Sequence, residues 1–136
     1  DERGVVAFNN DLDLATFVRA YMITNSETQQ FRGWHGHFHE SKVFICLNGV
    51  VSIGAVAIST FADIGSSNSE VWSFRLEAGS SDAVFVPAGY ANGILSLQPN
   101  SRALVLSSST LEESLKDDVR FHPSTWVMPA ENGRKN

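Results

Sequence analysis

Residues 42–53 read Lys-Val-Phe-Ile-Cys-Leu-Asn-Gly-Val-Val-Ser-Ile, so two apolar runs of strand length flank the pair Asn48-Gly49. Both residues of this pair tolerate a positive φ, and Asn-Gly between two such runs is the strongest short-range signal for a β-hairpin. The stretch therefore predicts two antiparallel strands, at residues 42–48 and 50–59, joined by a tight turn.

Similar short runs, rich in Val, Ile, Phe and Tyr and bounded by turn-forming residues, lie on both sides of this hairpin. Thr110 and Glu113 have capping-box spacing and predict one short acidic helix with a solvated face, which ends near Asp117. Residues 63–69 are expected to form an exposed loop, and residues 131–136 a frayed end. The further predicted strands are residues 5–8, 17–24, 33–40, 71–77, 83–86, 93–97 and 103–107.

Many short strands and one late helix predict an all-β sandwich or barrel, with residues 1–136 as a single domain. The 136 residues are 43% hydrophobic and 18% charged, as in ordinary globular proteins. A net charge of -5 argues against a nucleic-acid partner, and no apolar run approaches the ~20 residues of a membrane helix. The single cysteine, Cys46, excludes an internal disulfide. Nothing resembles a leader, and we expect a cytoplasmic protein.

Three of the four histidines fall in residues 32–40, Arg-Gly-Trp-His-Gly-His-Phe-His-Glu. Residues two apart in a strand share a face, so His35, His37 and His39 are predicted to form one row of imidazoles. Such a row suits the wall of a polar cavity better than an apolar core, because each buried ring needs a hydrogen-bond partner. A structural role remains the alternative, and it weighs most for His39.

Two functional interpretations of the histidines remain open. A His-x-His pair on a strand is a common start to a metal site, although the third and fourth ligands are not evident in this sequence. Alternatively, a histidine takes a proton from a carbon next to a ketone, while a donor stabilises the enolate oxygen. The candidate donors for that oxygen are Arg32, Lys42, Tyr21 and Tyr90.

Five segments resemble motifs of the cupin superfamily, and within it the dTDP-4-dehydrorhamnose 3,5-epimerase and dTDP-4-keto-6-deoxyglucose 3,4-ketoisomerase (WxcM-like) relatives. Residues 32–37 resemble the Arg-Gly-x-His-Ala-His motif of the ketoisomerases. Residues 86–93, Val-Pro-Ala-Gly-Tyr-Ala-Asn-Gly, resemble the epimerases' Pro-x-Gly-Phe-Ala-His-Gly. The other three segments are residues 1–4, 19–23 and 117–121. Together they cover nearly the whole chain, in order.

The resemblance implies an RmlC-like double-stranded β-helix (jelly roll) and a homodimer whose N-terminal strand joins the partner's sheet. It implies an isomerase of a dTDP-4-keto-6-deoxyhexose in deoxysugar or surface-polysaccharide biosynthesis, working without cofactor or metal. His35 or His37 is then the base, and Arg32 holds a phosphate or the enolate oxygen. Because Arg32 and His35 lie three residues apart, this also requires a bend at Gly33. The further pocket residues implied are Tyr21, Tyr90, Asn92 and Lys42, with Tyr90 a candidate proton donor.

The departures from the family pattern bear on function. Residues 107–111, Ser-Ser-Ser-Thr-Leu, hold no tyrosine where the epimerases carry their acid, which argues against epimerisation at two carbons. Asn92 replaces a histidine of the metal-binding cupins, and Ser41 or Lys42 stands where they have a glutamate, which argues against a tight metal site. An epimerase, a 3,4-ketoisomerase and a non-catalytic sugar-binding cupin remain open, with a metal-dependent cupin the least favoured.

Overall fold

The computed structural model describes residues 1–58, 69–129 and 133–135. Within these residues it contains one helix, α1 (Leu111–Lys116), which begins with the predicted capping box and ends at Asp117. The strands are β1 (Arg19–Asn25), β2 (Phe31–His37), β3 (Lys42–Asn48), β4 (Val50–Ala57), β5 (Val71–Glu77), β6 (Val84–Val86), β7 (Tyr90–Ser96), β8 (Ser101–Ser107), β9 (Val119–Arg120) and β10 (Gly133–Lys135).

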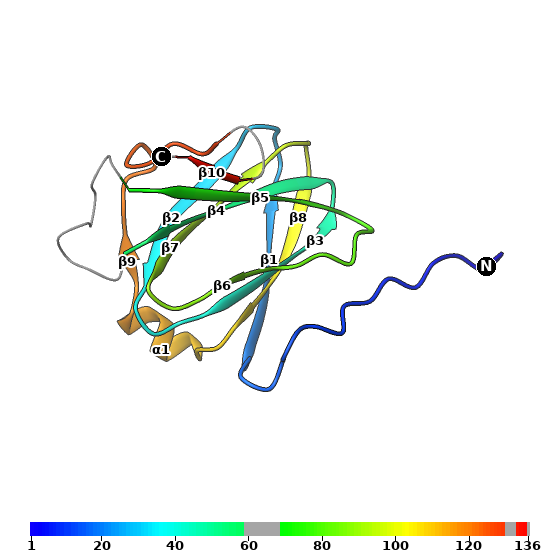
Figure 1. Ribbon diagram of the computed structural model, residues 1–136, viewed down its shortest axis with the longest axis horizontal. Helices are drawn as coiled ribbons and strands as arrows, with labels where there is room; N and C mark the ends of the chain where they lie inside the picture. The colour runs from blue at the N-terminus through cyan, green and yellow to red at the C-terminus, as the bar shows by residue number, and fades with distance from the viewer. Residues whose placement is uncertain (59–68, 130–132, 136) are drawn as a thin grey trace.

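The strands form two antiparallel sheets that face each other (Figure 1). One has the order β1-β8-β3-β6, and the other the order β10-β5-β4-β7-β2-β9. Apart from β4 and β5, which are consecutive, neighbouring strands in the two sheets are not consecutive in sequence, as in a jelly roll of two Greek keys. The all-β, jelly-roll prediction is confirmed.

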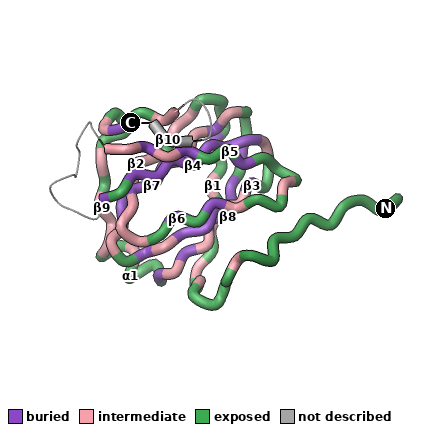
Figure 2. The backbone as a smooth tube through the Cα atoms, in the orientation of Figure 1, coloured by how far each residue is buried: buried purple, intermediate pink, exposed green. Residues whose placement is uncertain are grey.

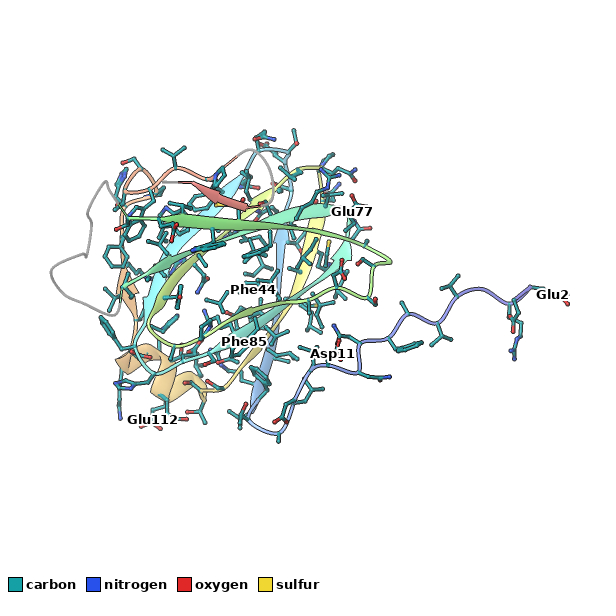
Figure 3. The ribbon with its side chains drawn as sticks, viewed as in Figure 1. Glu2, Asp11, Phe44, Glu77, Phe85 and Glu112 are labelled. Atoms are coloured by element: carbon teal, nitrogen blue, oxygen red, sulfur yellow. The ribbon has the colours of Figure 1, made fainter. Side chains whose placement is uncertain are left out.

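The main apolar core fills the space between the two sheets. Phe44 lies between them, 1% exposed (Figure 3), and packs with Val51, Ile53 and Ile94 from the six-stranded sheet. Figure 2 shows the buried backbone concentrated in these facing strands. The alternation of β3 and β7 thus delivers one apolar face of each strand to a shared interior.

A second core covers the outer face of the six-stranded sheet. Trp34 is 0% exposed, contacts Trp126 edge to face at 5.5 Å between ring centroids, and donates from Nε1 to the Trp126 carbonyl at 3.3 Å. A Cβ on Gly54 would lie 2.8 Å from the Trp34 ring, and one on Gly93 2.4 Å from Phe31. Trp126 therefore covers the outer face of this sheet. This is why seven of the eight residues of β4, on both faces, are buried.

The Asn48-Gly49 turn forms as predicted, but the hairpin prediction is wrong. Gly49 has φ +71°, yet β3 pairs with β6 and β8 while β4 pairs with β5 and β7. The turn passes the chain from one sheet to the other, and Ser101 holds it by accepting from the Val50 amide and donating to the Val50 carbonyl. The local signal specifies the turn, whereas packing between sheets decides what its arms pair with.

Three further predictions need correction. Residues 5–8 form no strand, and the N-terminal segment extends away from both sheets with Val5 and Phe8 exposed (Figure 1). Residues 133–135 of the end predicted to fray form β10, paired with β5. The predicted strand 33–40 is shifted, because β2 ends at His37. The predicted loop at 63–69 lies outside the described residues except for Ser69.

Replacing Trp34 with alanine should lower the free energy of unfolding by about 3–5 kcal/mol, since it empties the centre of the outer core. Trp72→Ala is the matched control, because Trp72 is only partly buried and stacks on the exposed Phe74. Urea unfolding followed by circular dichroism measures both losses. Equal losses for the two variants would contradict the central role given to Trp34.

Candidate active site

A pocket of about 430 Å³ lies between the two sheets. Strands β1 and β3 supply one wall, β2 and β7 the opposite wall, and α1 and β9 the rim. The lining residues are Arg19, Tyr21, Met22, Ile23, Thr24, Arg32, His35, His37, Lys42, Phe44, Asn92, Ile94, Leu111, Ser114, Leu115, Asp118 and Arg120.

A bulge in β2 brings Arg32 and the histidines to the same wall. Gly33 pairs with Gly93 and His35 with Asn92, so Trp34 is an extra residue without a cross-strand partner. Because of this extra residue, Arg32 and His35 lie on the same face of the sheet although they are three residues apart. Trp34 itself points into the outer core. The bend predicted at Gly33 is therefore present, and the Gly33–Trp34 peptide bond is cis.

His35 is partly buried, with Asn92 and Arg120 as its cross-strand partners. Burial, followed by the positive charges of Arg120 and Lys42, lowers the pKa of His35 below its usual value, against a smaller opposing effect of Asp118. Its imidazole is therefore neutral at pH 7 and has a free lone pair for a proton. This is the protonation state that a general base needs.

His37 is more deeply buried and is held by the end of α1. Its Nδ1 lies 2.9 Å from the Asp117 carbonyl, which makes Nδ1 the protonated nitrogen of the neutral ring. The Asp117 carboxylate accepts from the amides of Phe38, His39 and Glu40 at 2.8, 2.9 and 3.1 Å. Burial and then Lys42 lower the pKa of His37, while Glu40 and Asp117 oppose them. Asp117 thus holds the backbone in the turn that follows β2.

The wall opposite the histidines carries cations and one aromatic ring. The Arg19 guanidinium lies 4.9 Å from the Tyr21 ring centroid, and Lys42 Nζ lies 5.8 Å from it. Behind them the Glu40 carboxylate is 3.6 Å from Arg19 Nη2 and 3.4 Å from Lys42 Nζ. An anion that enters the pocket therefore meets positive charge on this side.

Six of the seven residues predicted for the site line the pocket: Tyr21, Arg32, His35, His37, Lys42 and Asn92. Tyr90 does not. It pairs with His37 across β2 and β7, but its ring packs against the core between the sheets. His39 also leaves the predicted row, because it follows the last residue of β2 and is exposed.

Sequence reasoning misses several residues in or next to the pocket. Strand alternation assigns Glu40 to the face opposite the histidines, whereas the turn after His37 carries it under the pocket. Arg19 and Arg120 occur in the quoted motifs without a role, and both line the pocket. The prediction that the acidic helix is only a solvated face is wrong, since three of its residues reach the rim of the pocket. The three are Leu111, Ser114 and Leu115. In the sequence, the spacing of Leu111 and Leu115 on one helix face already indicates a contact surface.

Across residues 1–58, 69–129 and 133–135, no group of three or more His, Cys, Asp or Glu side chains is arranged to hold a metal ion. No described helix is long and apolar enough to cross a membrane.

The sequence matches, over residues 1–124, the profile of the family described as WxcM-like, C-terminal (FdtA). No match was found among curated proteins. The profile match spans all six of the predicted residues that line the pocket.

Solved structures share this fold. The RmlC epimerase of Mycobacterium tuberculosis has a TM-score of 0.66 at 20% identity, over 80% of this chain and 53% of that chain. QdtA, a sugar 3,4-ketoisomerase from Thermoanaerobacterium thermosaccharolyticum in complex with TDP, has a TM-score of 0.64 at 22% identity, over 92% and 83%. NovW, a 4-keto-6-deoxy sugar epimerase from Streptomyces spheroides, has a TM-score of 0.65 at 21% identity, over 79% and 52%. The chain thus spans about half the length of these epimerases.

The titration of His35 tests the electrostatics of the site. In an NMR pH series, the chemical shift of its Cε1 proton should report a pKa below the usual histidine range. Arg120→Ala should raise the pKa of His35 by removing a nearby positive charge. Because the unfolded chain then binds this proton more tightly than the native state, acidification through that range should destabilise the fold. Arg75→Ala, a change on β5 away from the pocket, is the control. A His35 pKa that does not respond to Arg120→Ala would contradict this account.

Proposed function

Since the chain belongs to the WxcM-like family, we propose that it is a nucleotide-sugar isomerase, an epimerase or 3,4-ketoisomerase of a dTDP-4-keto-6-deoxyhexose. The observation that carries the proposal is the pocket itself, in which a neutral His35 on one wall faces Lys42 and Tyr21 on the other. A base and a hydrogen-bond donor on opposite sides of a ligand are what the formation of an enolate requires.

The first step is proton abstraction. His35 removes the hydrogen from the carbon next to the 4-keto group, that C–H bond breaks, and its electron pair forms a C=C bond to the former carbonyl carbon. The carbonyl π electrons move to the oxygen, where the Lys42 ammonium donates a hydrogen bond to the developing negative charge. Tyr21, beside Lys42 on the same wall, is the second donor available to that oxygen.

The second step decides the product. Return of a proton to the opposite face of the same carbon gives an epimer. Alternatively, the C3 hydroxyl loses its proton while the C4 oxygen gains one, and protonation of carbon C4 then leaves the carbonyl at C3, which gives the 3,4-ketoisomer. Both outcomes conserve atoms and electrons without a redox cofactor. The pocket also carries Arg32 and Arg120 near its opening, and their guanidinium groups suit the diphosphate of the nucleotide. In this proposal no step uses a metal ion.

A non-catalytic sugar-binding cupin is the second candidate. It is supported by the absence of a tyrosine in residues 107–111, where the resembled epimerases carry their acid. Ser107 is buried there, and its hydroxyl donates to the Ser109 carbonyl at 3.3 Å instead of facing the pocket. Ligand binding without hydrogen exchange distinguishes this candidate from an isomerase.

We also propose that the working unit is a homodimer. The outer face of the four-stranded sheet and the N-terminal segment expose large apolar side chains, which favours burial against a second copy. Their exposed fractions are 91% for Val5, 87% for Val6, 68% for Phe8 and 56% for Phe85.

Isomerase activity should appear as solvent exchange. Incubation with dTDP-4-keto-6-deoxyglucose in deuterated water should place deuterium on a ring carbon next to the ketone, as followed by proton NMR. His35→Ala should slow this exchange by a factor of about 10²–10⁴, because it removes the general base. Treatment with a chelator should leave the rate unchanged.

His39→Ala is the matched control, because His39 belongs to the same segment but is exposed and outside the pocket. Its exchange rate should equal that of the native protein. Native protein that binds the nucleotide sugar and labels none of several keto-sugars would favour the binding-only candidate.

Removal of residues 1–10 should shift the protein from dimer to monomer in analytical ultracentrifugation, because it deletes the exposed apolar side chains of Val5, Val6 and Phe8. Phe85→Glu tests the sheet face separately. A native protein that sediments as a monomer at micromolar concentration would refute the dimer.

A further inference from the structure

Glu40 is a buried carboxylate to which the proposed reaction gives no role. It follows β2 and precedes β3, and its side chain is 0% exposed. Its oxygens lie near three nitrogen atoms: Lys42 Nζ at 3.4 Å, Arg19 Nη2 at 3.6 Å and His37 Nε2 at 3.9 Å. All three of these neighbours line the pocket, while Glu40 itself lies behind them.

This carboxylate is held by charge and not by hydrogen bonds. Among the described residues, neither Glu40 oxygen has a hydrogen-bond partner, and His37 Nε2 has none either. A carboxylate taken out of water in this way is costly unless its charge is balanced. The positive charges of Lys42 and Arg19 provide that balance. A side chain with packing as its only purpose would not need this arrangement.

We propose that Glu40 is a positioning residue for the reaction, since its carboxylate anchors the Lys42 ammonium on the wall opposite His35. The inference rests on the proposed function. It deepens that function by naming a group outside the pocket on which the oxygen-stabilising donor depends.

The ion-pair geometry leaves the donors of Lys42 available. Lys42 Nζ has an ion pair with Glu40 at 3.4 Å, and since an ammonium carries three N–H donors, this contact leaves donors that can turn to a ligand oxygen. Without Glu40, the positive charges of Lys42 and Arg19 would be left together with no counter-charge. Their repulsion would displace the ammonium, and a displacement of about 1 Å is enough to cost a factor of about 10² in rate.

The pKa of His37 measures the charges of Glu40 and Lys42 without an activity assay. Glu40 raises and Lys42 lowers the pKa of His37, so removing one charge or the other should move this pKa in opposite directions. Glu40→Gln should lower the His37 pKa, and Lys42→Met should raise it. The charged groups that act on His37 are Glu40, just before β3, Lys42 at the start of β3, and Asp117 at the end of α1.

The experiment measures deuterium exchange into dTDP-4-keto-6-deoxyglucose, the Kd for dTDP and the His37 titration in native protein and in Glu40→Gln. We expect kcat to fall by about 10- to 100-fold, with the Kd for dTDP within about twofold of native. The double variant Glu40→Gln/Lys42→Met should be no slower than Lys42→Met alone, because Glu40 acts through Lys42. This comparison remains available if Glu40→Gln by itself does not fold.

Glu112 and Lys116 on α1 provide the matched control pair. Their nitrogen–oxygen distance is also 3.4 Å, but their side chains are 83% and 76% exposed, and Glu112 projects from the helix (Figure 3). Glu112→Gln should leave kcat, the Kd and the His37 pKa at native values.

The outcomes separate this inference from the proposed function. Native protein that exchanges no deuterium counts against the isomerase itself. The positioning role is overturned if native protein is active and folded Glu40→Gln matches its kcat. It is equally overturned if the double variant is much slower than Lys42→Met, or if the His37 pKa does not fall in Glu40→Gln.

Discussion

The pocket depends on one extra residue in β2. Trp34 has no cross-strand partner, and its insertion reverses the alternation between Gly33 and His35. The residues on either side, Arg32 and His35, therefore project into the pocket, while Trp34 enters the core on the other side of the sheet. In a regular strand Arg32 and His35 would lie on opposite faces of the sheet, so only one of them could reach the pocket. The bulge thus connects the chemistry of the pocket to the packing of the outer face.

Asp117 is the second constraint. Its carboxylate accepts three consecutive backbone amides just after β2, and its carbonyl accepts from His37. These contacts end the strand, orient one imidazole and turn Glu40 beneath the pocket. Because Asp117 also ends α1, the helix whose leucines lie at the rim is tied to the histidine strand. Asp117 therefore determines how β2, Glu40 and α1 lie relative to one another.

Much of the fold could be predicted from sequence, because period-two apolar patterns and turn residues act locally. The capping box of α1 and the strand bounds at β3 and β5 are of this kind. Pairing is not local, which explains why the Asn48-Gly49 turn was placed correctly but its arms were joined wrongly. Residues 5–8 have the composition of a strand yet find no partner within the described chain.

The site shows the same division. Histidines two apart and the nearby donors Lys42 and Tyr21 could be read from the sequence itself, and the resemblance added Asn92. Tyr21, Lys42 and Asn92 all line the pocket. Tyr90 matched a motif, but its ring packs into the core. Glu40 could not be found, because its position depends on where β2 stops, and that is set by Asp117, 77 residues away in sequence.

The six-stranded sheet is packed on both sides, with the pocket on one face and the tryptophan-rich core on the other. Its backbone is therefore held in place largely by residues that a ligand never touches. Residues that line the pocket can therefore change while the tryptophans preserve the scaffold, so the chemistry of the pocket can vary without loss of the fold.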